Sequence, residues 1–325
     1  MPKAIVCREL GPPESLRLEQ FTSLPLKPGQ VRVAIRAAGI NFPDILMAAG
    51  EYQLKPELPF TPGMEAAGDI SEIADDVKGF KPGDRVIVKL RHGGYAEEVV
   101  VTPSQLTPLP STFDYAEGAT FLAAHGTAHH ALVDRGQIKR GEVLLVHGAG
   151  GGVGLAAVEI GKLLGATVIA AASSEEKLAV AKARGADHGV LYGSGPFRDA
   201  VKRITDGKGV DVVFDPVGGE IFEQSLRCIN WGARLLVIGF TGGIGVAKTN
   251  LVLIKGASVL GVRAGEAARR DPAIGEARIA QLLAWAEAGQ IRPNVSHRLP
   301  LASVAQAMRL LTDRKAIGRV ALLLG

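Results

Sequence analysis

The chain has 325 residues, 47% of them hydrophobic and 22% charged, which is typical of a globular protein long enough for two domains. A net charge of +4 without any long run of lysines and arginines, and only 5% aromatic residues, argue against a nucleic-acid-binding surface. Two cysteines cannot build a disulfide framework or a four-cysteine zinc site, no apolar run reaches membrane-spanning length, and no signal peptide is evident, so a cytoplasmic protein is expected.

The first part of the chain, up to about residue 122, is predicted to be mostly β-structure. Residues 31–36 alternate strictly between apolar and polar, as in a half-buried strand. The Pro-Gly pair at 82–83 is a turn signal that leads into a strand at 84–88, and residues 95–101 form another strand candidate. Many short strands with proline and glycine turns indicate a barrel-like β-domain.

An alanine-rich segment at 116–132 predicts a helix that is interrupted at Gly126. From residue 142 onward, strands and helices alternate. The strand candidates are short and continuously apolar, as expected when helices cover both faces of a sheet. Six such strands predict a doubly wound parallel sheet with a nucleotide at its switch point. The strand candidates are 143–146, 167–172, 187–191, 211–215, 234–239 and 258–262, and the helix candidates are 153–164, 175–184, 197–205 and 219–228.

The segment between the first strand and helix of this region is a glycine turn, residues 147–154. It carries A-x-G-x-x-G, formed by Ala149, Gly151 and Gly154. Glycines let the backbone turn tightly and approach phosphate oxygens, and the helix that follows directs its free N–H groups at an anion. The order of strand, turn and helix predicts a pyrophosphate site, although a plain glycine-rich loop is the alternative.

The residue after the second strand indicates which dinucleotide is bound. An NAD site has an acid there, whereas this chain has Ser173, which leaves room for a 2′-phosphate. Lys177 lies in the first turn of the next helix, where a cation opposes the helix dipole, so an anionic partner would explain its presence. NADPH is therefore expected. The alternative is that Ser173 and Glu176 form a capping box and leave Lys177 in solvent.

The end of the chain is predicted to hold two helices, at about 273–288 and 303–313, and a last strand at 318–324. No partner strands remain nearby for this last strand, so we expect it to return to the first domain. The sixth strand of the parallel sheet, 258–262, leaves an unpaired edge that a two-fold partner can fill, which predicts a homodimer.

Taken together, seven motifs resemble the zinc-free quinone oxidoreductases, the zeta-crystallin-like branch of the medium-chain dehydrogenase/reductase superfamily. The resemblance covers essentially the whole chain. It implies a GroES-like catalytic domain of residues 1–122 plus 266–325, with a Rossmann dinucleotide-binding domain of residues 123–265 inserted, as well as NADPH, hydride transfer and homodimers. The motifs are AGINFPD at 38–44, PGMEAAG at 62–68, GGYAE at 93–97, HGTA at 125–128, AGGGVG at 149–154, DPVGG at 215–219 and KAIGR at 315–319.

The same resemblance implies roles for individual residues. The 2′-phosphate pocket corresponds to Ser173, Lys177 and Tyr192, and the pyrophosphate turn to Gly151, Gly152, Val153 and Gly154. Ser174 is also expected to bind the cofactor. The nicotinamide surround corresponds to Thr127 and the loop of Gly239, Phe240 and Thr241, and Arg319 is the tail residue that reaches the cofactor. The substrate cleft is lined by Asn41, Tyr52 and Arg263, and Asn41 is also expected to bind the cofactor. Leu46 departs from the relatives that have tyrosine at this position, which leaves the contacts to the substrate ring open.

No metal is expected, because the zinc-dependent cousins need a cysteine near Asn41 and a histidine near Met64, and neither is present. His125, His129 and His130 lie on the alanine-rich helix and are interpreted as packing residues.

A metal-free enzyme must hold a quinone or an activated alkene against the nicotinamide and stabilise the negative charge that develops on a carbonyl oxygen. Asn41, Tyr52 and Arg263 are the candidate donors, although Asn41 also suits a helix cap, Tyr52 a plain loop and Arg263 a phosphate or interdomain contact. The alternatives in function are a reductase dedicated to enones, enals or acrylates, and a non-catalytic NADPH-binding protein of the crystallin or RNA-binding kind.

Overall fold

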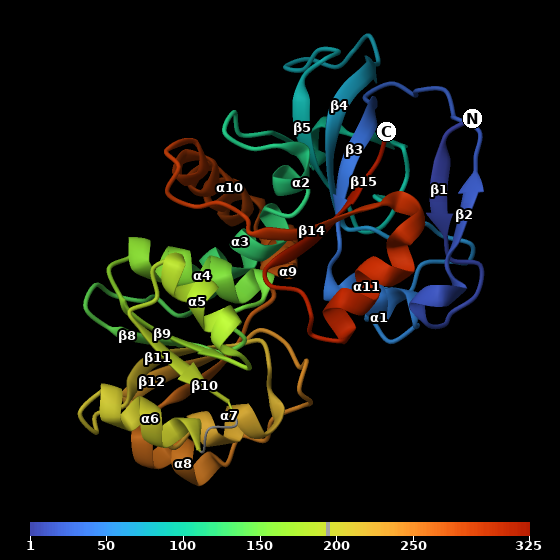
Figure 1. Ribbon diagram of the computed structural model, residues 1–325. Helices are drawn as coiled ribbons and strands as arrows, with labels where there is room; N and C mark the ends of the chain where they lie inside the picture. Colours follow the sequence, from blue (N-terminus) through green and yellow to red (C-terminus); the bar gives the residue numbers. More distant parts are fainter. Residues whose placement is uncertain (193–195) are drawn as a thin grey trace. The chain divides into compact units, whose positions relative to one another are not determined.

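The computed structural model describes residues 1–192 and 196–325, which form two compact units (Figure 1). Unit 1 contains residues 1–123 and 292–325, and unit 2 contains residues 124–291. The return to the first unit was expected at residue 266, but it occurs at 292. Helix α10 (Pro272–Glu287) stays in unit 2, because Arg278 donates to His130 and Asp134, at 3.0 and 3.1 Å, and Trp285 packs on His129.

Unit 1 is built on a seven-stranded sheet and a separate two-stranded sheet. The predicted β-rich domain is confirmed, and its large sheet is open and not a closed barrel. The sheet is mixed, since β14 and β15 are parallel and the other pairs antiparallel. Strand β3 pairs β4 along one edge, while β6 and β15 share the other edge, so the sheet branches at β3. The order is β14 (Val295–Pro300), β15 (Arg319–Leu323), β3 (Val31–Gly39), β4 (Glu65–Ile73), β5 (Arg85–Lys89) and β7 (Leu106–Pro108), with β6 (Glu98–Val101) on β3 and β1 (Lys3–Val6) pairing β2 (Arg17–Gln20).

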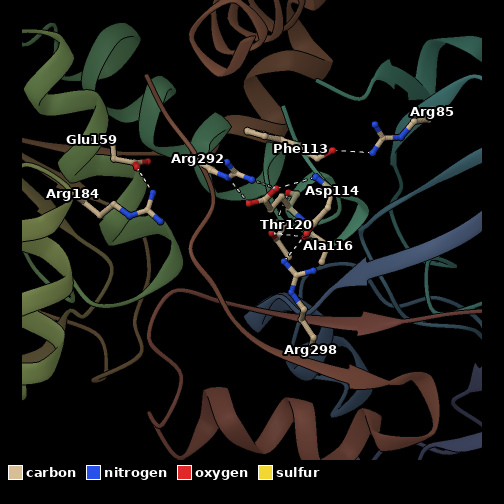
Figure 2. Close-up of polar contacts among 10 residues, drawn as sticks. Arg85, Phe113, Asp114, Ala116, Thr120, Glu159, Arg184, Arg292 and Arg298 are labelled. Atoms are coloured by element: carbon tan, nitrogen blue, oxygen red, sulfur yellow. Dashed lines mark hydrogen bonds and ion pairs between the residues drawn. The ribbon is translucent and has the colours of Figure 1, made fainter. Parts of the chain in front are cut away.

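Both ends of the chain contribute to unit 1, as the sequence predicted for the last strand. Figure 1 shows β15, in red, beside β3, in blue, and the two strands pair from Ala321 opposite Gly39. Strand β14 is tied to the short helix α2 (Tyr115–Gly118) by an ion pair of 2.7 Å between Arg298 and Asp114, and Arg292 pairs with Glu117 (Figure 2). Helix α11 (Val304–Thr312) adds its buried face to the core of unit 1.

Unit 2 is a six-stranded parallel sheet covered by helices, which confirms the predicted doubly wound fold. The strand order β10-β9-β8-β11-β12-β13 is the 3-2-1-4-5-6 order of dinucleotide-binding domains. Leu144, Leu145 and Val146 of the central strand β8 are fully buried, which explains its purely apolar sequence. The strands are β8 (Val143–Val146), β9 (Thr167–Ala172), β10 (His188–Leu191), β11 (Val210–Asp215), β12 (Ile229–Val237) and β13 (Ser258–Gly261). The helices are α4 (Gly152–Leu163), α5 (Glu175–Ala183), α6 (Phe197–Ile204), α7 (Gly219–Ser225), α8 (Thr249–Lys255) and α9 (Ala264–Arg270).

The helix expected at 116–132 is divided, but not at Gly126. Helix α2 ends at Gly118, where the Thr120 hydroxyl donates to the carbonyls of Ala116 and Glu117, and α3 (Leu122–His129) runs through Gly126 into a π-helical turn at His130–Arg135. A glycine lowers helix propensity by only about 1 kcal/mol, which the surrounding packing overrides. Among the helices of the described residues, none has the length and apolarity needed to cross a membrane.

Candidate cofactor and substrate site

The glycine turn of unit 2 is shaped by close backbone packing. Gly148 has a φ of 57°, and its carbonyl accepts the N–H of Gly151 at 2.9 Å. A Cβ at Gly154 would lie 2.3 Å from the Gly148 carbonyl oxygen, so this position accepts only glycine without a shift of the backbone. Gly151 is the N-cap of α4, and the helix therefore begins directly at the turn.

The N-terminus of α4 offers N–H groups to an anion. Gly152, Val153 and Gly154 are its first three residues, and N–H groups at these positions have no acceptor within a helix. The turn lies between the carboxyl ends of β8 and β11, which are neighbours at the point where the strand order reverses. Ligands bind in the crevice at this point in open parallel sheets. The glycine-rich turn and the helix end fit a dinucleotide pyrophosphate.

Ser173 and Lys177 are brought together at the end of β9. The Lys177 ammonium donates to the Ser173 hydroxyl at 3.3 Å, and the Lys177 stem covers the glycine turn, because a Cβ at Gly150 would meet it at 2.6 Å. The alternative capping box is wrong: Ser174, not Ser173, is the N-cap of α5 and accepts the N–H of Lys177 at 3.3 Å. Ser173 is exposed and does not cap the helix.

Tyr192 follows β10 and is attached to β9 by its N–H, which donates to the Ala172 carbonyl at 2.9 Å. Its hydroxyl lies 2.8 Å from His147 Nδ1 and 3.1 Å from the N–H of Gly148. The other ring nitrogen of His147 lies 2.7 Å from the hydroxyl of Ser225. Sequence reasoning missed His147 and Ser225, although His147 opens the predicted turn.

Other expected residues of unit 2 lie on three further elements. The loop after β12 carries Gly239 and Phe240, and the Phe240 side chain is 55% exposed. This loop is attached to the loop after β11, because the N–H and the hydroxyl of Thr241 both donate to the Pro216 carbonyl. Thr127 is half-buried in α3. Arg263 is exposed at the N-cap position of α9.

Unit 1 places Asn41 and Arg319 in one buried polar cluster. Arg319 donates to Asn41 Oδ1 at 2.8 Å and pairs with Glu65, while Asn41 Nδ2 donates to Glu65 Oε1 at 3.3 Å. Glu65 was missed by sequence reasoning, although it is the only charged residue of the motif at 62–68. The Arg319 Nε donor is buried and has no partner in the described part of the chain.

Asp44 extends this cluster. Its carboxylate accepts the N–H of Asn41 at 2.9 Å and the hydroxyl of Tyr95 at 2.8 Å, and its burial raises its pKa to about 7. Burial also raises the pKa of Glu65, against the opposing effect of Arg319. Asn41 occupies the N-cap position of α1 (Phe42–Ala48), but its carboxamide binds Glu65 and Arg319.

Tyr52 follows α1 in unit 1 and is half-buried against the core of that unit. Its N–H donates to the carbonyl of Leu46, which is also half-buried, at 3.2 Å.

His125 of α3 and His130 of the π-helical turn have polar partners, whereas the buried Nδ1 of His129 has none among the described residues. His125 Nε2 lies 3.1 Å from Glu159, which also accepts from Arg184 (Figure 2), and His130 Nδ1 lies 2.7 Å from Asp134. Within residues 1–192 and 196–325, no three histidine, cysteine, aspartate or glutamate side chains form a group that could hold a metal ion.

Two family models match the chain. Residues 27–111 match the alcohol dehydrogenase GroES-like domain, and residues 152–285 match the zinc-binding dehydrogenase domain. The chain is 38% identical to quinone oxidoreductase-like protein 2 of Rattus norvegicus over 98% of this chain and 91% of that protein.

Two solved structures are similar over nearly their whole length. A quinone oxidoreductase of Pseudomonas syringae has a TM-score of 0.90 and 29% identity, covering 99% of this chain and 100% of its own. A mycobacterial protein solved in complex with NADPH has a TM-score of 0.90 and 29% identity, covering 99% of both chains. These similarities extend over both units.

Proposed function

The chain belongs to the zinc-free quinone oxidoreductase branch of the medium-chain dehydrogenase/reductase superfamily, and from this premise we propose that it transfers a hydride from NADPH to quinones or activated alkenes. The observation that carries the choice of cofactor is the pair of Ser173 and Lys177 beside the glycine turn. A hydroxyl and an ammonium group suit a 2′-phosphate, and no carboxylate follows β9 directly to repel it. The NADPH complex of the mycobacterial relative supports the same choice.

In this proposal the nicotinamide supplies the hydride, and the chain binds and orients the cofactor. The N–H groups of α4 hold the pyrophosphate. The unpaired, buried Nε of Arg319 is a donor that an anionic group of the cofactor would satisfy. The residues proposed to contact the cofactor are Asn41, Thr127, Gly151, Gly152, Val153, Gly154, Ser173, Ser174, Lys177, Gly239, Phe240 and Arg319.

The proposed donors to the substrate are Asn41, Tyr52 and Arg263. The direction of the Asn41 contacts supports a donor role, because its carbonyl oxygen is taken by Arg319 and one amide hydrogen by Glu65. The second amide hydrogen remains to stabilise negative charge on a carbonyl oxygen. Tyr52 and Arg263 are assigned by resemblance, and Arg263 has its guanidinium exposed.

Oxidation of NADPH by the purified protein tests this function. We expect turnover with quinones, with enals or acrylates, or with both. The loss of NADPH absorbance at the nicotinamide band measures this turnover. Turnover with enals and acrylates but not with quinones would identify a dedicated double-bond reductase. Binding of NADPH without turnover of any acceptor would favour the non-catalytic alternative.

We propose that no zinc takes part, because Asn41 and Met64 stand where the zinc-dependent cousins need cysteine and histidine. The assay above is therefore expected to be unaffected by EDTA. Activity that falls on chelation and returns with added zinc would contradict this assignment.

We propose a cytoplasmic setting, which suits the two free cysteines. Cys7 and Cys228 are buried and unpaired with each other. Burial raises the pKa of the Cys7 thiol and raises that of Cys228 to about 12, so neither forms a reactive thiolate.

We propose a homodimer formed through β13, the last strand of the unit 2 sheet. This strand lies at the edge of the sheet order, and Val259 is 37% exposed on it. Large exposed apolar side chains also occur on neighbouring elements of unit 2, with Trp231 in β12 73% exposed and Leu253 in α8 79% exposed. An unpaired strand edge with apolar side chains invites pairing with a second copy.

Light scattering is expected to give twice the chain mass at working concentration, and Val259→Pro, which removes a strand N–H, is expected to give the monomer. The matched control is Val246→Pro, in an exposed loop outside β13, which should leave the dimer intact. A monomeric wild type, or a Val259→Pro variant of unchanged mass, would contradict the prediction.

A further inference from the structure

A continuous chain of hydrogen bonds leads from the glycine turn into α7. The N–H of Gly148 donates to the Tyr192 hydroxyl at 3.1 Å, and this hydroxyl lies 2.8 Å from His147 Nδ1. His147 Nε2 lies 2.7 Å from the Ser225 hydroxyl, which donates to the carbonyl of Ile221 at 2.8 Å. His147 and Ser225 are fully buried.

The Ile221 carbonyl and the Gly148 N–H at the two ends of the chain fix which atom donates and which accepts in every hydrogen bond between them. The carbonyl of Ile221 only accepts, so Ser225 gives it the hydroxyl hydrogen and accepts from His147 Nε2–H. His147 Nδ1 then carries no hydrogen and accepts from the Tyr192 hydroxyl. The Tyr192 oxygen in turn accepts the N–H of Gly148, so every group in the chain is satisfied.

This arrangement needs a neutral imidazole in one tautomer. Burial lowers the pKa of His147 to about 3, which keeps the ring neutral across the physiological range. The ring is also held by Phe197, whose centroid lies 5.0 Å away in an edge-on contact, and it stacks on Tyr192 at 5.9 Å. A fixed tautomer and a fixed ring make the hydrogen-bond chain a rigid support.

This chain of hydrogen bonds ends at Gly148, the residue that shapes the glycine turn. Gly148 has the left-handed backbone of the turn, and its carbonyl accepts from Gly151 and lies against Gly154. A change in the orientation of the Gly148 peptide would therefore move the N-terminus of α4.

We propose that His147, Tyr192 and Ser225 are positioning residues, which hold the glycine turn in the shape that binds the pyrophosphate of the dinucleotide. This inference rests on the proposed function, because it takes a dinucleotide as the ligand. It also gives Tyr192 a role different from the 2′-phosphate contact that the family resemblance implies. The hydroxyl of Tyr192 already has two partners, the imidazole and the Gly148 N–H.

The two roles of Tyr192 predict different binding patterns. NADPH and NADH share the pyrophosphate, whereas 2′-AMP carries the 2′-phosphate without it. Tyr192→Phe is expected to weaken NADPH and NADH by the same factor, about fivefold to tenfold for one hydrogen-bonded support, and to leave 2′-AMP binding unchanged. Dissociation constants from isothermal titration of the full chain give all three values. Lys177→Ala is the contrasting control, since it should weaken NADPH and 2′-AMP but not NADH.

A second pair of variants tests the support beyond Tyr192. In His147→Asn, the side-chain oxygen replaces Nδ1 and still accepts from Tyr192, whereas His147→Leu offers no acceptor. We expect asparagine to retain most of the affinity for both dinucleotides and leucine to lose it. Thermal unfolding of each variant shows whether the fold is retained, and the asparagine variant keeps the test decisive where leucine fails to fold.

The outcomes separate this inference from the proposed function. If Tyr192→Phe weakens NADPH and 2′-AMP while NADH is unchanged, or changes none of the three, the positioning role is wrong even though the cofactor assignment stands. If the wild type binds neither dinucleotide, the proposed function itself fails. Equal weakening in a protein that prefers NADH supports the positioning role and overturns only the NADPH assignment.

Discussion

Arg319→Met is expected to lower the free energy of unfolding by about 3–5 kcal/mol, because it leaves the buried carboxylate of Glu65 without its cation. Both side chains are less than a tenth exposed in the native protein. Urea or guanidinium unfolding at pH 8, with wild type alongside, measures the loss. A variant as stable as wild type at pH 8 would show that the pair is not needed.

The loss should depend on pH in a defined direction. Burial already raises the pKa of Glu65, and removing Arg319, whose charge opposes this, raises it further. A folded-state pKa above the unfolded value makes stability fall as pH rises between those two values. We therefore expect Arg319→Met to approach wild type near pH 5 and to fall behind toward pH 8. Adding Glu65→Gln, which removes the charge, should restore much of the stability at pH 8.

The second large effect concerns cofactor choice. Lys177→Ala is expected to weaken NADPH tenfold or more and NADH little, since a charge-assisted contact contributes about 1.5–3 kcal/mol. Ser173→Asp is expected to abolish or reverse the preference, because a carboxylate repels the 2′-phosphate and binds free ribose hydroxyls. Dissociation constants for both dinucleotides decide the matter.

Lys182→Ala is a matched control, because it removes the same charge from the last turn of the same helix. It should leave both dissociation constants unchanged. Equal affinity of the wild type for NADH and NADPH, or equal weakening of both by Lys177→Ala, would overturn the assignment of the 2′-phosphate site.

Much of unit 2 could be predicted because its physical signals are local. Strands buried on both faces are short apolar runs, and the strands at 143–146 and 167–172 have the predicted bounds. The alternative interpretation places the cap of α5 at Ser173, one residue before the observed cap Ser174, because both serines are good caps. The choice between them depends on where β9 ends, which the tertiary structure decides.

In the candidate site, too, contacts between residues close in sequence could be predicted, and contacts between distant residues could not. Lys177 and Ser173 are four residues apart at a strand–helix junction, so their meeting follows from local geometry. His147 and Ser225 are 78 residues apart, and Glu65 and Arg319 are 254 apart. Such pairs depend on sheet order and register, which a single sequence does not reveal. The same holds for α10, whose place in unit 2 is set by contacts to His130 and Asp134.

The pairing of β15 with β3 has a consequence for how the protein is made. Strand β3 leaves the ribosome before residues 124–291, but its neighbour at 319–323 leaves after them. At about 5–20 residues per second, those intervening residues occupy the ribosome for roughly 10–30 s. During that time the edge of β3 beside Ala37 and Ala38 is uncovered and open to pairing with other nascent chains. Unit 2 is complete in sequence before unit 1 is, so β3 must wait for its partner strand until all of unit 2 has been synthesised.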